Sequence, residues 1–384
     1  MHERTSSRNV KSLAKNLPGQ VVLVLQGGGA LGSYQAGVYQ ALHEAGIEPD
    51  WIIGTSIGAI NASLIAGNPV EDRLPRLKEF WKRMEQNPVW NIRTVFPGFN
   101  ERLSYWATIT HGIPGFFRPN ALAHAGDSYP LGAERAGYYS TAPLEQTLGE
   151  LVDVNLLNSC SPRLTVGAAH VRTSQMRYFD SRDGELTIRH IMASGALPPA
   201  FPAVRIDGEL YWDGGILSNT PTEVVFDDNP RKNSLIFAVH LWNPAGLEPT
   251  TMAEVLNRHK DVQYSSRIMS HIGRQQQAHR LRHIINELAK RLPDSERNTP
   301  EVRDLVGYGC QTRMHVVRLL APQLDRETHT KDIDFSPRGI MQRWDAGYTH
   351  TRAALEHAPW VGEFDPLSGV ILHEQMELMP VAAE

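Results

Sequence analysis

The sequence has few cysteines, no long apolar run and little net charge. Cys160 and Cys310 lie far apart and form no CxxC pair, so we expect reduced structural thiols, and a single disulfide stays open as the alternative. The longest apolar run, Val21 to Leu25, is far too short to span a bilayer. The formal net charge of −4, with 21% of the residues charged, fits neither a nucleic-acid-binding nor a disordered protein.

The N-terminal residues are polar and basic and lack an apolar core segment. We therefore expect no secretory signal and a cytoplasmic protein, and we leave peripheral contact with the inner membrane surface open. A length of 384 residues suits one large or two modest domains. The chain has no internal repeat and no clear linker, which favours one domain with decorations.

A serine between two glycines organises the chain. The apolar run that starts at Trp51 leads into Gly54-Thr55-Ser56-Ile57-Gly58, and small residues continue with helical spacing. This order of strand, sharp turn and helix is typical of a nucleophile elbow, G-x-S-x-G, where bulky neighbours would collide with the strand and the helix. The N-terminal N–H groups of the helix would face charge that develops in acyl transfer. The pattern alone also fits an ordinary glycine-bounded turn.

A glycine loop precedes this elbow by one strand–helix unit. The run Val21 to Gln26 predicts a strand buried on both faces of a parallel sheet, and Gly27-Gly28-Gly29-Ala30-Leu31-Gly32 follows it. The loop matches G-x-G-x-x-G, which raises nucleotide binding as one interpretation. That fold needs an acidic residue at the carboxyl end of its second strand, whereas Asp50 precedes the strand. The alternative is an oxyanion hole, because parallel strands end on one side of the sheet and bring the loop to Ser56.

The base of an acyl transfer could be a histidine or a carboxylate. The 16 histidines keep a triad open, but none lies in a comparably constrained motif. Asp213 lies in such a motif, because Gly214 and Gly215 follow it. A carboxylate shielded from water would have a pKa raised toward the working range. By itself this motif fits a hairpin turn. His279 and His283 are four residues apart with no Glu between them in an H-E-x-x-H arrangement, so we predict no metal site.

Three further segments carry expectations. Residues 88–140, rich in Gly, Pro and aromatics, fit either a lid or a surface excursion that its aromatics anchor to the core. Residues 251–292 predict helices with a basic face, typical of contact with an anionic membrane or of a solvated outer face. Asp332 to Pro337 predicts the cap of a last helix, and we expect the tail after Pro359 to be peripheral.

Taken together, these blocks resemble the patatin-like phospholipase family. The loop 27–32 resembles its oxyanion loop and residues 54–58 its elbow. Residues 193–202, Ala-Ser-Gly-Ala-Leu-Pro-Pro-Ala-Phe-Pro, resemble its proline block, and residues 213–215 its D-G-G/A motif. Order and spacing agree over roughly residues 20–240, and residues 332–348 resemble the C-terminal extension of a bacterial subgroup.

The resemblance implies a three-layer α/β/α patatin-like fold with a mainly parallel central sheet. Residues 1–19 would form a flexible arm, 20–245 the catalytic domain with 88–140 as a lid or insertion, and 246–384 a mainly helical extension packed on it. It implies a Ser–Asp dyad without histidine, no metal and no cofactor. In that dyad Ser56 is the nucleophile and Asp213 the general base. The oxyanion hole comprises Gly27, Gly28 and Gly29, with Gly32, Gly54, Gly58, Gly214 and Gly215 as supporting glycines.

The implied substrate is a lipid or other acyl ester, with one departure from the family pattern. The family loop usually carries Arg or Lys before its last glycine, and Leu31 stands there. This weakens the phospholipid assignment more than the hydrolase assignment. The alternatives are the same dyad acting on a neutral lipid, an acyl thioester or an intracellular polyester. An alternative of another class is a lipid-binding regulatory protein with a hydrolase shell. Oligomeric state and positional preference are left open.

Overall fold

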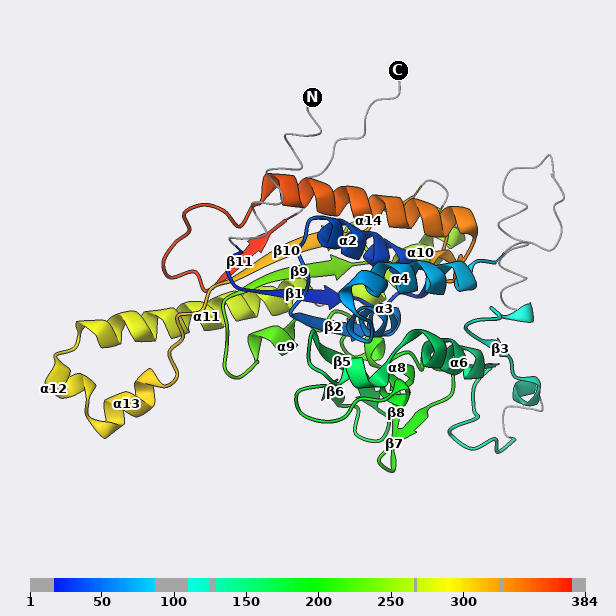
Figure 1. Cartoon of the computed structure of the whole chain (residues 1–384), viewed down its shortest axis with the longest axis horizontal. Coiled ribbons are helices and arrows are strands. Elements are labelled where there is room, and N and C mark those ends of the chain that lie inside the picture. The colour runs from blue at the N-terminus through cyan, green and yellow to red at the C-terminus, as the bar shows by residue number, and fades with distance from the viewer. Residues whose placement is uncertain (1–16, 87–109, 125–128, 266–267, 325–326, 375–384) are drawn as a thin grey trace, which may run out of the picture.

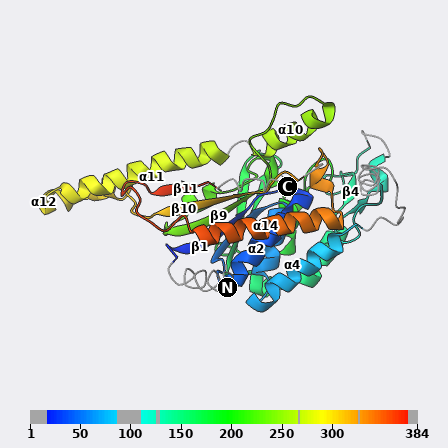
Figure 2. The same ribbon diagram turned by 90° about the horizontal axis from the view of Figure 1, so that it is seen from above.

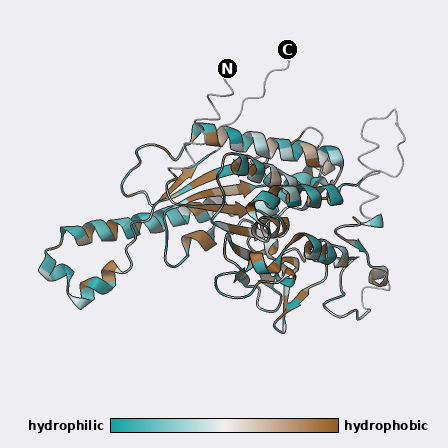
Figure 3. Ribbon diagram, viewed as in Figure 1, coloured by the Kyte–Doolittle hydropathy of each residue, from teal (hydrophilic) through white to brown (hydrophobic). Residues whose placement is uncertain are grey.

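A mainly parallel sheet forms the middle of the molecule, and helices cover both of its faces (Figure 1). The computed structural model describes residues 17–86, 110–124, 129–265, 268–324 and 327–374. This arrangement confirms the predicted α/β class. Figure 3 shows strands that are largely apolar and outer helices that are largely polar, as expected when the core lies on both sides of the sheet.

In the described part of the chain, nine strands form the central sheet in the order β11-β10-β9-β1-β2-β5-β8-β7, with β6 pairing with β5 off this path. The strands are β1 (Gln20–Leu25), β2 (Trp51–Thr55), β5 (Arg163–His170), β6 (Met176–Asp180), β7 (Val204–Ile206), β8 (Glu209–Asp213), β9 (Ser234–His240), β10 (Met314–Leu320) and β11 (Val370–His373). The strands from β11 to β5 run parallel, whereas β6, β8 and β7 pair antiparallel. A small separate sheet joins β3 (Arg118–Pro119) to β4 (Tyr139–Ser140).

The helices include those expected after Ser56, within residues 251–292 and beyond the cap at residues 332–337. They are α2 (Ser33–Glu44), α3 (Ile57–Ala66), α4 (Val70–Met84), α6 (Ala142–Leu151), α7 (Val154–Leu157), α8 (Ile188–Ser194), α9 (Glu223–Phe226), α10 (Met252–Ser265), α11 (Ile268–Arg291), α12 (Asp294–Arg297), α13 (Pro300–Val306) and α14 (Pro337–His357). Short 3-10 turns are η1 (Gly29–Gly32), η2 (Ala121–His124), η3 (Gly214–Ile216) and η4 (Lys331–Ile333). None of the described helices is long and apolar enough to cross a bilayer.

The central strands β1, β2 and β9 are almost completely buried on both faces, as the continuous apolar run of β1 predicts. On β1, Val22 and Val24 belong to a cluster completed by α9 and by Ile272 of α11, whereas Leu23 and Leu25 face a larger cluster built with α2, α3 and α14. The sheet therefore has a layer of helices on each side. Cys160 and Cys310 are both free thiols.

The C-terminal part of the chain completes the same sheet. Helix α14 lies along α2 (Figure 2), and β10 pairs in parallel with β9. The expectation that the tail after Pro359 is peripheral is wrong, because Val370–His373 forms β11 beside β10 and Trp360 is buried against Phe237. A four-residue strand carries too short a pattern to be distinguished from a loop.

Parts of two predictions lie outside the described residues. These are the arm over residues 1–16 and the proposed lid over 87–109 and 125–128. In the described remainder of the 88–140 segment, Ile113, Phe116 and Phe117 are buried, and both Phe rings contact Phe201. These aromatics anchor the segment to the core, which is one of its two interpretations.

Candidate active site

Ser56 lies at the turn between β2 and α3 in a backbone conformation that L-residues rarely adopt, with φ 57° and ψ −126°. The flanking glycines make this turn sterically possible. A Cβ at Gly54 would lie 2.4 Å from the Gly58 carbonyl oxygen, and one at Gly58 would lie 2.2 Å from the Leu25 carbonyl oxygen. The Ser56 amide donates to Ser194 Oγ at 3.0 Å, so α8 also holds the turn. The geometry is that of the predicted elbow.

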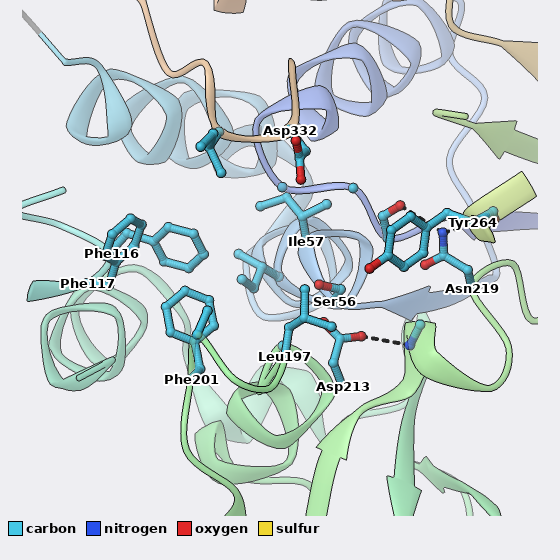
Figure 4. Close-up of a pocket in the computed structure, with 18 of the residues that line it drawn as sticks. Ser56, Ile57, Phe116, Phe117, Leu197, Phe201, Asp213, Asn219, Tyr264 and Asp332 are labelled. Atoms are coloured by element: carbon cyan, nitrogen blue, oxygen red, sulfur yellow. Dashed lines mark hydrogen bonds between the residues drawn. The ribbon is translucent and has the colours of Figure 1, made fainter. Parts of the chain in front are cut away.

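Strand β5 brings Asp213 to the same place. Its residues 163–167 pair with β2, and Ala168 pairs with Asp213 of β8. Strand β6 pairs with β5 over Thr165–Ala169 and so occupies one edge of β5. Strands β2 and β8 therefore pair with the opposite edge, one after the other along β5. Along this edge of β5, Asp213 at the end of β8 therefore lies next to Thr55 at the end of β2. In Figure 4 the side chains of Asp213 and Ser56 face one another.

The carboxyl group of Asp213 is held away from water. Its residue is only 2% exposed, and this burial raises the pKa to about 6, while interactions with the Ser56 side chain and the Gly215 amide oppose the rise. The Gly215 amide donates to Asp213 Oδ1 at 2.7 Å (Figure 4). A carboxylate with such a pKa is ionised at neutral pH and still basic enough to accept a proton.

The glycine loop lies across the same end of the sheet. The Gly27 amide donates to the Asn219 carbonyl at 3.2 Å, and the Gly27 carbonyl accepts from Trp242 Nε1 at 2.8 Å. In the described structure the amides of Gly28 and Gly29 have no protein acceptor. Gly29 has a φ of +56° and packs against the Asp332 carbonyl, where a Cβ would lie 2.2 Å away.

The supporting glycines pack where a side chain would collide. A Cβ at Gly32 would lie 2.5 Å from Ile57 Cγ1, and one at Gly214 would lie 2.5 Å from the Gly167 carbonyl oxygen. Gly215 and Asn219 line the site itself. The structure therefore brings every sequence-predicted site residue to one region, with Gly32, Gly54, Gly58 and Gly214 behind its surface.

A largely apolar cavity of about 290 Å³ opens beside Ser56 and Asp213. Its apolar wall comes from five separate parts of the chain: Ile57, Ile60, Phe116, Phe117, Tyr139, Leu197, Phe201 and Phe335. Figure 4 shows Phe116, Phe117 and Phe201 gathered on one side of it and Tyr264 with Asn219 on the other. Such a lining suits an acyl chain, with the polar groups confined to one end.

Sequence reasoning missed several contributors to this site. Ser194 links the Ser56 amide to the Gly167 carbonyl, and Asn219 Nδ2 donates to the Gly27 carbonyl. Asp332, from η4, lines the cavity and accepts from Lys260 Nζ at 2.7 Å. Trp242 had a usable signal, since it follows the carboxyl end of β9 at the edge of the sheet where the elbow lies.

Neither a histidine nor a cation lines this cavity in the part of the chain that the structure describes. His279 is buried against Phe226, and His283 Nε2 lies 2.9 Å from the Thr312 carbonyl, both far from Ser56 along the chain. Leu31, which stands where the family carries a cation, is buried in the apolar core. The described residues contain no group of three metal-ligating side chains.

The fold and the site together define a class: an α/β protein with a serine on a strained strand–helix elbow beside a buried carboxylate. The family model for patatin-like phospholipase matches residues 23–226, and one described as patatin phospholipase matches residues 262–367. The chain belongs to the patatin-like phospholipase family, a family of lipid acyl hydrolases.

Named relatives agree with this placement. The chain is 28% identical over 271 residues to lysophospholipase nte1 of Aspergillus niger, an alignment that covers 64% of this chain and 15% of that protein. It is 27% identical over 215 residues to a patatin-like phospholipase domain-containing protein of Caenorhabditis elegans, covering 56% of this chain and 13% of the relative. The chain thus spans a small share of these much longer proteins. The crystal structure of VipD from Legionella pneumophila aligns with a TM-score of 0.38 at 18% identity, covering 88% of this chain and 67% of that one.

Proposed function

We propose that this protein is a serine acyl hydrolase that cleaves fatty-acyl ester bonds of lipids with a Ser56–Asp213 dyad. The observation that carries the proposal is the pairing of Ser56, on its strained turn, with a buried Asp213 whose pKa is about 6, at the end of an apolar cavity. A nucleophile, a base and an acyl-binding wall are the three parts that the reaction requires.

In the proposed mechanism, Ser56 Oγ attacks the acyl carbonyl carbon and its proton passes to the Asp213 carboxylate. The amides of Gly28 and Gly29 hold the oxyanion of the tetrahedral intermediate, because they have no other acceptor in the described structure. Collapse of this intermediate breaks the ester bond, and the leaving alcohol takes the proton from Asp213. Water, deprotonated by Asp213, then attacks the acyl carbon of the acyl-enzyme. The bond between Ser56 Oγ and the acyl group breaks, Ser56 Oγ takes the proton back from Asp213, and the fatty acid leaves.

Substitution of each dyad residue tests this proposal. We expect Ser56→Ala and Asp213→Asn each to lower kcat/KM for a short-chain p-nitrophenyl ester by at least about 1,000-fold, since each removes a group that acts directly in the reaction. Asp183→Asn, at an exposed carboxylate outside the site, serves as the matched control and should retain full activity. A fluorophosphonate probe should label the wild type and not Ser56→Ala.

Two results would refute the dyad. Near-normal hydrolysis by either variant with an unchanged fold would show that another group performs the step. Absence of probe labelling in a folded wild-type protein would instead favour the lipid-binding alternative, because a protein without an activated serine reacts with no such probe.

The charges around the cavity favour esters with an uncharged or zwitterionic head. Apart from tyrosines, the ionisable side chains of the described lining are Asp213 and Asp332, and Leu31 supplies no cation. An anionic headgroup or a coenzyme A thioester would therefore meet carboxylates without a free cation. We assign neutral lipids and zwitterionic phospholipids or lysophospholipids as the substrate class. We further propose that the protein is cytoplasmic and meets these lipids at a lipid surface.

A further inference from the structure

Helix α10 presents an apolar outer face to solvent. Its large apolar side chains are exposed by 42 to 73%: Met252, Val255, Leu256 and Val262. At 100° per residue these four positions, with His259 and Gln263, fall within one arc of the helix, and no Asp, Glu, Lys or Arg lies in that arc. The opposite side of α10 carries the buried residues Asp261 and Ser265. A soluble helix normally has the reverse polarity.

The basic side chains that flank this outer face are bonded to other groups of the protein. Lys260 Nζ bonds to Asp332 Oδ1 at 2.7 Å, and Arg258 donates to the main-chain carbonyls of Asn243 and Pro244. On the inner side, Asp261 pairs with the buried Lys331 at 2.7 Å. These contacts hold α10 in one orientation. Its apolar arc therefore faces solvent in a helix that is firmly attached to the rest of the protein. Figure 2 shows α10 standing away from the sheet, at the side of the molecule.

The outer face continues to the rim of the candidate active site. Gln263 lines a smaller polar cavity of about 150 Å³ together with Ile216, which is 44% exposed and directly follows Gly215. This smaller cavity shares Gly215, Asn219 and Tyr264 with the apolar cavity beside Ser56. Leu247, 93% exposed, lies shortly before α10 in the chain. Gln263 of the outer face and the exposed Ile216 therefore line one small cavity that adjoins the acyl site.

The size of this surface indicates its occupant. Fourteen residues make α10 about 21 Å long, and a third of the circumference of a helix about 11 Å wide gives an arc of about 240 Å². A stable protein interface buries about 800 Å² on each partner, so this arc is too small for a second copy or another protein. A lipid surface needs no such area, because insertion of a few apolar side chains from a helix that lies in the interface is enough for reversible binding.

We infer that the outer face of α10, with Ile216 and Leu247, inserts into a zwitterionic lipid surface and so presents the acyl site to its substrate. The inference rests on the proposed function, because docking presents the acyl site to its substrate only if that substrate is a lipid. Because the arc carries no charged side chain, its insertion needs no anionic lipid. The basic face predicted over residues 251–292 is not the contacting face at α10, where Arg258 and Lys260 are held by protein groups.

Binding of the full-length chain to phosphatidylcholine vesicles tests this inference by flotation. Leu256→Glu and Met252→Glu should each lower the fraction bound at least about tenfold, because each replaces one inserted apolar side chain by a charge. The matched control is Leu281→Glu, at a leucine of α11 that is even more exposed than Leu256, which should bind as the wild type. The ratio of vesicle hydrolysis to hydrolysis of a soluble ester should fall with the bound fraction. Thermal melting checks that each variant is folded.

The possible outcomes separate the docking surface from the chemistry. Ser56→Ala should bind vesicles as the wild type does, so loss of the proposed activity leaves the binding test intact. The inference is overturned if folded Leu256→Glu binds normally, if Leu281→Glu loses binding equally, or if only vesicles with anionic lipid bind. It is equally overturned if wild type is a dimer that Leu256→Glu converts to monomer, since the occupant is then a second copy.

Discussion

Asp213 is an ionisable side chain held away from water on the last residue of β8. Burial, which gives the carboxyl group a pKa of about 6, also makes its ionised form costly in the folded state. Under the proposed mechanism, the same group therefore affects the rate and the stability in opposite directions as the pH rises. Both effects follow from the raised pKa of this one carboxyl group, so they can be tested together.

The pH profile follows from the role of a base. We expect kcat/KM for a soluble ester to rise about tenfold per pH unit below about 6 and to level off above it, because only the ionised carboxylate accepts the proton. Stopped-time assays between pH 4.5 and 8 in buffers of constant ionic strength measure this profile. A profile that is flat through pH 5 to 7 would contradict Asp213 as the base.

The stability has the opposite dependence. A carboxyl group whose pKa rises on folding from 3.8 to about 6 holds its proton more tightly when folded, so its contribution is favourable below pH 4 and is lost as the pH rises to 6. The difference corresponds to about 3 kcal/mol. Asp213→Asn should therefore gain about this much in free energy of unfolding, relative to wild type, between pH 4 and pH 7. Urea titrations at the two pH values measure the gain, and Asp183→Asn should show none.

We expect Asp332 to influence which lipid headgroups the site accepts, because it lines the cavity. Replacing it by Asn removes a carboxylate from the cavity wall and frees Lys260, its partner at 2.7 Å. We expect Asp332→Asn to raise kcat/KM for an anionic phospholipid several-fold relative to a zwitterionic one, and Lys260→Met to lower that ratio. Parallel assays on the two lipids in detergent micelles measure it. Equal ratios in wild type and both variants would remove Asp332 from substrate selection.

At the scale of elements, α2 and α14 approach at two glycines. A Cβ at Gly347 would lie 2.0 Å from the Tyr34 carbonyl oxygen, and one at Gly37 would lie 1.9 Å from the Trp344 carbonyl oxygen. Gly347→Ala should destabilise the protein by about 3 kcal/mol, because backbone atoms of both helices must separate. The control is Gly149→Ala in α6, where nothing lies within 4 Å and a gain of about 0.5–1 kcal/mol is expected. Denaturant midpoints distinguish the two; equal effects would contradict this account.

The sequence predicted the elements that have long, regular patterns and the site residues that lie in motifs. The run before Gly27 and the turn around Ser56 could be placed because local sterics require both. Asn219 and Asp332 could not, since their direction toward the site depends on how distant segments pack. The same limit applies to β11, whose four residues gain their structure only from β10.

At the scale of the whole molecule, the C-terminal part completes structures that the first part leaves open. Without it, β9 would lose β10, and the apolar face of α2 would lose α14. The glycine loop would lose the Asp332 carbonyl that packs on Gly29. The division into a catalytic domain over 20–245 and an extension over 246–384 remains a prediction, and these contacts argue that the two fold as one unit.

Truncation tests that unity. We expect a chain that ends at residue 245 to be insoluble or unfolded and without esterase activity, because it exposes a strand edge and an apolar helix face. The full chain should unfold in one cooperative urea transition by both circular dichroism and tryptophan fluorescence. Two separate transitions, or a soluble truncated chain that hydrolyses p-nitrophenyl esters at the wild-type rate, would show that residues 246–384 are an independent decoration. In that case the contribution of Asp332 and Tyr264 to the cavity would be dispensable for chemistry.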